Sequence, residues 1–410
     1  MSNRIIIVGG GASGMMAAII ARRKGSEVTI LERNDRVGKK LLATGNGRCN
    51  YTNENINLNF FHGEDKEFIR SVLDRFTNTE VIEFFESLGI VPAVEDNGKV
   101  FPLSFQSSSM LDVLRYEMQR LNIKLETESY VVKITKDKSF NLYTKDGRNF
   151  KADKIIIATG GMAMPVSGSD GNGYSIAQTF MHVKNEPTPA LVQLKLIGDK
   201  WKQINGVKFI GKASLIINDK YIADDIGDIL FTDYGVSGPP ILQLSREAIK
   251  AKKEGKSVKI GISILHNKTK KEVFEYLKER FQKMPEKTLE ESLIGMINKR
   301  LILPIIKELG MDKDKHSYDI NEVEVSSLAE ILVNWEFELS GDKGWGHAQT
   351  TAGGISLEKI NPDTMESKIV EGLFLCGELL DVDGDCGGYN LQWAWSSGYI
   401  AGSNAGYFDK

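Results

Sequence analysis

Two apolar runs with a glycine-rich turn between them occupy the first thirty residues. Residues 5–8 are all β-branched, as in a strand that is buried on both faces. The turn at 9–14 reads GGGASG, and the apolar stretch 15–24 that follows has the length of a helix. A second strand is predicted over 27–31, with Glu32 at its end. The pattern predicts a strand–turn–helix–strand unit that ends in an acidic residue.

The same stretch also has the layout of a secretory signal, with Arg4 before an apolar core. Three consecutive glycines interrupt that core, and a helical signal segment tolerates them poorly. No later segment supplies the roughly 20 apolar residues that a membrane span needs. We therefore expect a cytoplasmic protein without a membrane partner.

Two later regions repeat the pattern of a buried strand followed by glycines. Short alternating stretches over 130–150 predict a small β-meander, and a strand over 154–157 leads into the turn Thr159-Gly160-Gly161. Near the C-terminus, a strand over 373–376 precedes Gly387-Gly388, which we expect to open a long helix. These signals place nucleotide-binding elements at both ends of the chain.

The middle of the chain carries no nucleotide signal. Residues 191–264 predict short strands separated by Gly and Asn-Asp turns. Helices are predicted over 269–283, 289–309 and 323–339, the second of them interrupted or kinked at Pro304. The expected domains are residues 1–190 and 346–410, forming one nucleotide-binding domain, and residues 191–345, forming an inserted β-rich domain with a small helical portion.

Composition narrows the class of partner. The 41% hydrophobic and 26% charged residues describe an ordinary globular protein, and a net charge of −3 argues against a nucleic-acid partner. The three cysteines form no CxxC pair and the five histidines are scattered, so we expect a reducing compartment and no metal site.

The GxGxxG spacing suits a dinucleotide cradle. Gly9 permits the tight turn, Gly11 lets the backbone approach a pyrophosphate, and Gly14 lets the helix pack on the strand. The helix N-terminus offers unpaired amides and a partial positive charge to the phosphates. Glu32 would accept both ribose hydroxyls of an adenosine and would repel a 2′-phosphate, which excludes NADP from this site. These features do not separate FAD from NAD.

Three other segments favour FAD: the loop at 38–50, the strand at 154–157 with its Thr-Gly-Gly turn after the predicted meander, and the C-terminal block at 372–395. The polar loop GKKLLATGNGRCN at 38–50 can lie along an extended ligand, although it is also typical of a solvated surface loop. The C-terminal helix start can aim amides at the flavin N1–C2 edge, where negative charge gathers on reduction, and a bulky residue at Gly388 should then clash with the ring. The stretch GSDGNG at 168–173 lacks the context of a second cradle, and we expect it to serve the same domain.

The chain resembles the FAD flavoprotein family that includes aminoacetone oxidase and the bile-acid-pathway flavin reductases. The matching blocks run in family order from residue 5 to 402: VGGGASGMMAA, GKKLLATGNGRCNYTN, ATGG, LFTDYGVSGPPILQLS, TTAGGISL and CGELLDVDGDCGGYNLQWAWSSGYIAG. The resemblance implies an α/β fold with a Rossmann-like, two-dinucleotide-binding FAD domain, discontinuous around the inserted domain. It also implies FAD that is bound non-covalently.

The motifs and the resemblance together nominate the cofactor-binding residues. They are Gly9, Gly11, Ala12, Ser13, Gly14, Glu32, Arg33, Lys40, Leu41, Asn46, Gly47, Arg48, Cys49, Asn50, Val132, Thr159, Gly160, Gly161, Gly377, Glu378, Asp381, Gly387, Gly388, Tyr389, Asn390 and Leu391.

Weaker candidates exist for catalysis. Arg48 suits an anionic or carbonyl group of a substrate, or else a salt bridge that holds its loop. Cys49 would lie near the flavin, as a redox partner of Cys386 or as a small packing residue. Asp233 and Tyr234 have side chains suited to acid–base chemistry.

The expected activity is hydride transfer at flavin N5 to or from a small organic substrate. It would be reduction of an enone or ketone with NAD(P)H, or oxidation of an amine with O2. The chain has no second nucleotide cradle, so the electron donor stays open. One alternative is a flavin-bearing RNA-modification or interaction protein, which we expect to need a basic extension. Another is a plain NAD dehydrogenase, which would leave the C-terminal block without a purpose.

Overall fold

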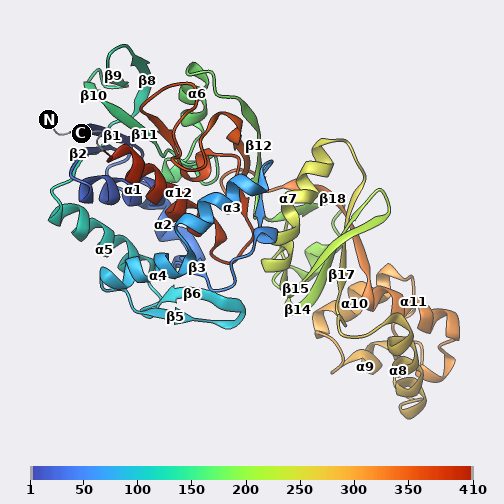
Figure 1. Ribbon diagram of the computed structural model, residues 1–410. Coiled ribbons are helices and arrows are strands. Elements are labelled where there is room, and N and C mark those ends of the chain that lie inside the picture. The colour runs from blue at the N-terminus through green and yellow to red at the C-terminus, as the bar shows by residue number, and fades with distance from the viewer. Residues whose placement is uncertain (1–2, 408–410) are drawn as a thin grey trace. The chain divides into compact units, whose positions relative to one another are not determined.

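The computed structural model describes residues 3–407 (Figure 1). The chain forms two compact units. The first combines the chain up to Pro189 with the chain from Ala348 onward, and the second is Ala190–His347. No helix among residues 3–407 is both long and apolar enough to cross a membrane.

A five-stranded parallel sheet is the centre of the first unit. Its strand order is β20-β11-β1-β2-β7, so the C-terminal strand extends the edge formed by β11. Ile5, Ile6 and Ile7 of β1 are buried, as expected for a central strand covered on both faces. The strands are β1 (Arg4–Val8), β2 (Glu27–Leu31), β7 (Lys124–Glu126), β11 (Lys154–Ile157) and β20 (Leu373–Leu375).

Helices α1 and α12 lie side by side against this sheet (Figure 1). Two glycines of α12 make that contact close: a Cβ on Gly398 would meet the Ser13 carbonyl oxygen at 2.5 Å, and one on Gly402 would meet that of Ala17 at 2.4 Å. The helices of the unit are α1 (Ala12–Arg23), α2 (Lys39–Ala43), α3 (Lys66–Arg75), α4 (Asn78–Ser87), α5 (Ser107–Arg120), α6 (Asn172–Thr179) and α12 (Tyr389–Ala405).

Small sheets complete the first unit. The meander predicted over 130–150 is present as the sheet β8–β9–β10, and the Asp146-Gly147 turn connects two of its strands. The small strands are β3 (Thr52–Asn53), β4 (Phe61–His62), β5 (Pro92–Val94), β6 (Lys99–Pro102), β8 (Val131–Lys136), β9 (Phe140–Thr144), β10 (Asn149–Ala152), β12 (Lys184–Ala190), β19 (Thr350–Ile355) and β21 (Asp383–Gly384).

The second unit is a closed antiparallel barrel with helices. Its first and last strands pair with each other, Leu194 opposite Asp342, so both ends of the insertion leave the barrel at one seam. The strands are β13 (Leu194–Leu196), β14 (Lys208–Ile217), β15 (Lys220–Phe231), β16 (Gly235–Ser237), β17 (Val258–Ser263) and β18 (Trp335–Asp342). The helices are α7 (Pro239–Lys253), α8 (Lys270–Lys283), α9 (Leu289–Leu293), α10 (Lys299–Glu308) and α11 (Glu322–Val333).

The predicted α/β fold class is confirmed, but three predictions in the insertion are wrong. Helix α7 lies within the region 191–264, for which only strands were predicted. Its two prolines are compatible with a helix because they occupy the first turn, where no backbone amide is needed. The helix predicted over 323–339 ends at Val333, and β18 follows with alternating burial. The break predicted at Pro304 lies at residues 294–298 instead, and Pro304 is inside α10.

Candidate functional site

A cavity lies in the first unit along the carboxyl ends of β1, β2 and β11. Thirteen of the nominated residues line it: Gly9, Gly11, Ala12, Ser13, Glu32, Arg33, Lys40, Leu41, Thr159, Gly160, Glu378, Asn390 and Leu391.

The three motif glycines have different surroundings. A Cβ on Gly9 would meet the Ala158 carbonyl oxygen at 2.5 Å, and one on Gly14 would meet that of Gly9 at 2.0 Å. A Cβ on Gly11 would meet no protein atom within 4 Å, and Gly11 lines the cavity at the start of α1. The first and third glycines therefore permit close packing, whereas the second leaves open space for a ligand.

Glu32 is buried at the cavity wall, and its carboxylate has fixed partners. Oε2 accepts a hydrogen bond from the Gly10 amide at 2.8 Å, and Oε1 accepts from both the backbone and the side-chain nitrogen of Asn34 at 2.8 Å. A carboxylate accepts about four hydrogen bonds, so these three leave room for about one more. Glu32 can therefore bind one ribose hydroxyl in this arrangement, rather than the two expected from the sequence.

Two hydroxyl groups on the cavity wall lack partners. Thr159 Oγ1 and Ser169 Oγ are buried, and neither hydrogen-bonds to any other described residue. Leaving a buried hydroxyl unpaired costs about 1–3 kcal/mol, which a polar ligand would offset. The open space at Gly11, at the N-terminus of α1, fits the phosphate oxygens of a nucleotide.

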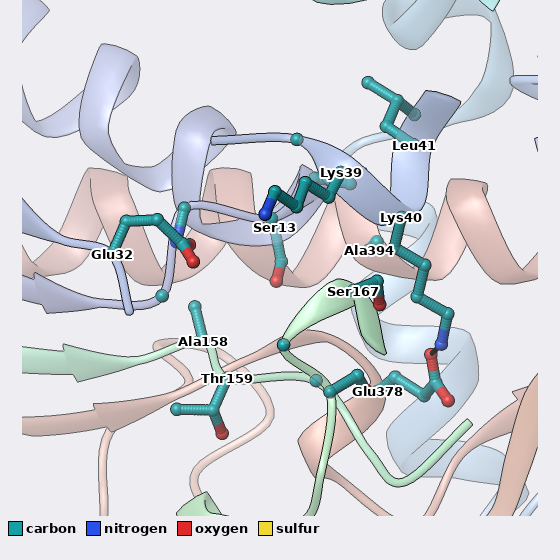
Figure 2. Close-up of a pocket in the computed structure, with 18 of the residues that line it drawn as sticks. Ser13, Glu32, Lys39, Lys40, Leu41, Ala158, Thr159, Ser167, Glu378 and Ala394 are labelled. Carbon is teal, nitrogen blue, oxygen red and sulfur yellow. Dashed lines mark hydrogen bonds and ion pairs between the residues drawn. The ribbon is translucent and has the colours of Figure 1, made fainter. Parts of the chain in front are cut away.

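An ion pair at the cavity wall joins the two chain halves of the first unit. Lys40 Nζ lies 2.5 Å from Glu378 Oε2, and Figure 2 shows the pair at the opposite end of the view from Glu32. Glu378 Oε1 accepts from the Thr351 amide at 2.9 Å, and the Thr351 hydroxyl accepts from the amides of Met162 and Ala163. This network places Thr351 next to Glu378, which lines the cavity.

The first turn of α12 is hydrogen-bonded to the loop that precedes it. Asn390 Oδ1 accepts from the Gly384 amide at 2.8 Å, and its Nδ2 donates to the Gly384 carbonyl at 2.7 Å. Gly388 has φ +96°, and a Cβ there would meet the Thr52 carbonyl oxygen at 2.4 Å. The expected clash between a larger residue at Gly388 and a flavin is therefore wrong, because the protein backbone itself fills that space.

The segment 38–50 forms α2 and a tight turn rather than an extended loop. Lys39, Lys40, Leu41 and Thr44 line the cavity, whereas the nominated residues Asn46, Gly47, Arg48, Cys49 and Asn50 are not among its lining residues.

The two catalytic candidates in this segment have structural contacts. Arg48 forms an ion pair with Glu95, and its guanidinium lies over the rings of Phe101 and Phe105 at 4.2 and 4.6 Å. Cys49 is a fully buried free thiol, and burial raises its pKa to about 12. The salt-bridge and packing alternatives describe what these two residues do in the structure.

The remaining nominated residues of the first unit are not among the residues that line the cavity. A Cβ on Gly161 would meet Thr351 Oγ1 at 2.4 Å, and one on Gly377 would meet Ser13 Oγ at 2.3 Å. Asp381 accepts from Asn185. Val132 is half exposed, while its neighbours 129–131 line the cavity. Close packing surrounds Gly14 in the first turn of α1, and Gly387 and Gly388 in the turn before α12. Tyr389 is the first residue of α12, and burial raises its pKa to about 12.

The last two catalytic candidates, Asp233 and Tyr234, belong to the second unit, where the Lys343 ammonium lies 4.3 Å from the Tyr234 ring centre. Their role in acid–base chemistry stays a prediction.

Several lining residues were not nominated from the sequence. They are Asn34, Ser129, Tyr130, Ser167, Ser169, Asn172, Gln349 and Trp393 among others. The glycine-rich stretch 168–173 was the available signal for part of this group. The others carry no motif, because their proximity to the cradle arises from the packing of distant segments.

Comparison with known proteins gives full-length matches. Residues 3–404 match the protein family described as "HI0933-like protein Rossmann domain". A 3-dehydro-bile acid Δ4,6-reductase of Clostridium scindens is 38% identical, with 98% of this chain and 99% of that protein covered. A ribosomal RNA dihydrouridine synthase of Haemophilus influenzae is 30% identical, with 96% of each chain covered.

A solved structure shares the fold. A 3-ketosteroid Δ1-dehydrogenase from Sterolibacterium denitrificans superposes with a TM-score of 0.50 at 11% identity, over 99% of this chain and 100% of that one. The two sequence relatives and the family match all extend over nearly the whole chain, which confirms the resemblance found from the motifs. The chain belongs to the HI0933-like family of Rossmann-domain proteins.

Proposed function

We propose that this protein, an FAD-dependent oxidoreductase, reduces a carbon–carbon double bond conjugated to a carbonyl, with non-covalently bound FAD and NAD(P)H as electron donor. The observation that carries the proposal is the 38% identity, over 98% of the chain, with a reductase named for the Δ4,6 double bonds of a 3-dehydro-bile acid. In such a compound the double bonds are conjugated to the 3-oxo group.

The Haemophilus relative supports the same chemistry. Forming dihydrouridine means reducing the 5,6 double bond of uracil, which is conjugated to a ring carbonyl. The names of the two relatives therefore imply reduction of the same kind of bond, a carbon–carbon double bond conjugated to a carbonyl, although their substrates differ. This shared chemistry favours reduction of a conjugated alkene over oxidation of an amine with O2.

We expect FAD to lie along the cavity. Glu32 would accept a ribose hydroxyl, and the open space at Gly11, at the N-terminus of α1, would receive the pyrophosphate. Asn390 and Leu391, in the first turn of α12, would lie at the other half of the cofactor. FAD supplies hydride transfer at N5, and the chain orients the cofactor and limits access of water.

The test separates the two half-reactions. The purified protein should be yellow, and denaturation should release FAD rather than FMN. Under anaerobic conditions NADH or NADPH should bleach the flavin, and a 3-oxo-4-ene steroid acid should restore its colour. The matched control is the same acid with the 4,5 bond saturated, which should leave the flavin bleached. Reoxidation by neither compound, or O2 consumption with an amine and no NAD(P)H, would contradict the proposal.

A second candidate substrate is uridine in ribosomal RNA. The H. influenzae relative and an Escherichia coli protein of the same name are each 30% identical over 96% of their own lengths. The expectation that an RNA-modifying member needs an added basic extension is therefore wrong. Incubation of the NAD(P)H-reduced protein with a ribosomal RNA transcript, followed by nucleoside mass spectrometry, tests this candidate. Dihydrouridine without steroid reduction would assign the protein to RNA.

A further inference from the structure

Residues 167–172, called the clasp below, form one wall of the cavity and are tied to the residues after Glu32. Arg33 Nη1 lies 2.5 Å from Asp170 Oδ2 and donates to the Gly168 carbonyl at 3.4 Å. Asn34 Nδ2 donates to the Ser167 carbonyl at 2.9 Å and also to Glu32. The clasp is thus connected by side chains to the strand end that presents Glu32.

The backbone of the clasp allows this close approach. Gly168 has φ +102°, and a Cβ there would meet Asn34 Nδ2 at 2.6 Å. At the other end, Asn172 Nδ2 donates to the Val131 carbonyl at 3.2 Å. The Arg33 guanidinium also lies 4.3 Å from the ring centre of Tyr130, which lines the cavity. Three segments far apart in the sequence therefore meet around one end of the cavity.

Ser169 points to a ligand at this end. The residue is 5% exposed, it lines the cavity, and its hydroxyl has no hydrogen-bond partner among the described residues. In contrast, Arg33 and Asp170 each retain 30% of their side-chain exposure. The group that would meet the ligand is buried, while the ion pair that closes the clasp is accessible to water and can break.

We propose that the clasp closes over the adenosine half of bound FAD, with the Arg33–Asp170 ion pair as its latch and Ser169 as a direct hydrogen-bonding partner of the nucleotide. The adenosine half is assigned because the latch follows Glu32, the ribose acceptor, directly in the chain. Binding and release of FAD then require the latch to open. The inference depends on FAD binding and is independent of the substrate that the flavin reduces.

Release of FAD from the holoprotein tests the latch. Asp170→Asn removes the ion pair but keeps the side-chain size, and FAD should leave on dilution roughly 2- to 5-fold faster, measured as free flavin fluorescence. Ser169→Ala should release FAD about 2- to 10-fold faster, since one hydrogen bond is lost. Asp170→Glu keeps the charge and should release FAD more slowly than Asp170→Asn.

A matched control exists in the same unit. Arg4 and Asp153 form an Arg–Asp pair at 2.8 Å with side chains 46% and 40% exposed, and neither lines the cavity. Asp153→Asn should release FAD at the wild-type rate. Equal acceleration of FAD release in Asp153→Asn and Asp170→Asn would mean that losing any Arg–Asp pair loosens the protein, and it would overturn the latch. A wild-type rate of FAD release in Asp170→Asn would also overturn it.

A double-mutant cycle tests whether Arg33 and Asp170 act together, and binding of ADP and FMN tests which half of FAD the clasp contacts. Combined with Asp170→Asn, Arg33→Gln should add little further acceleration if the two side chains act as one latch. ADP, which carries only the adenosine half, should lose affinity by the same factor as FAD, and FMN should lose none. Additive rates, or a loss confined to FMN, would overturn the proposal. A wild-type protein that holds no FAD would refute the cofactor assignment before any variant is made.

Discussion

At the scale of single residues, Gly11 and Gly388 show how similar motif positions have different roles. Both belong to glycine turns before a pocket-lining helix. Gly11 faces open space in the cavity, whereas Gly388 faces the Thr52 carbonyl. A larger side chain would therefore compete with the ligand at the first position and with the protein backbone at the second.

This difference predicts opposite outcomes for the same substitution. Gly11→Val should fold and melt like the FAD-free wild type but bind FAD at least about 10-fold more weakly. Gly388→Val should lower the free energy of unfolding by roughly 2–5 kcal/mol, because a β-branched residue is strained at positive φ and overpacks the turn. Thermal melts of the FAD-free proteins, compared with flavin titrations, measure both. Normal stability in Gly388→Val would contradict this account of the turn.

The cysteines give a second prediction at this scale. Burial raises the pKa of both Cys49 and Cys376 to about 12, so at neutral pH both are thiols rather than reactive thiolates. Cys386 is only partly buried. Iodoacetamide should label Cys386 first in the folded protein and the other two only after denaturation, as peptide mass spectrometry can follow. Rapid labelling of Cys49 in the native protein would restore it as a reactive candidate.

At the scale of elements, the contact between α1 and α12 positions the cavity. The first turns of both helices line it, and the two helices touch through glycines farther along α12. Because the backbones approach so closely, a side chain at Gly402 has no room. The same contact links the N-terminal and C-terminal parts of the first unit, so the cradle depends on the end of the chain.

Gly402→Leu should accordingly destabilise the first unit by about 1–3 kcal/mol or more and weaken FAD binding, although leucine favours helix more than glycine does. The matched control is Ser403→Leu, which adds the same side chain at a partly exposed position of the same helix. Only the first variant should lower the melting temperature markedly. Equal melting temperatures would show that α12 can move away from α1 at little cost.

At the scale of the whole molecule, the seam between β13 and β18 brings the two ends of the insertion together. A fragment of residues 190–347 should therefore fold alone, with a cooperative melt, and bind no flavin. In the full chain, added FAD should raise the melting temperature of the first unit and leave that of the second unchanged, because a ligand stabilises only the unit that binds it. Flavin binding by the fragment would contradict this division.

Part of the fold and of the site was predictable because it depends on neighbours in the sequence. The β-branched run of β1, the glycine turn and the acid at the end of β2 have local periods and conformational needs, and each is found where predicted. The strand at 154–157 and the helix after Gly388 follow the same rule. Family motifs extended this to the discontinuous layout of the first unit.

Only the tertiary structure decided which polar side chains reach the cavity. Arg48 belongs to a family motif, yet its guanidinium is held by Glu95 and two aromatic rings. Ser169 was not nominated, yet it lines the wall, and its hydroxyl has no hydrogen-bond partner among residues 3–407. The same holds for the Lys40–Glu378 pair, whose members are 338 positions apart. Local pattern determines the period and ends of an element, because those depend on adjacent residues. The partners of a side chain depend on which distant segments pack together, and that information is absent from any short stretch.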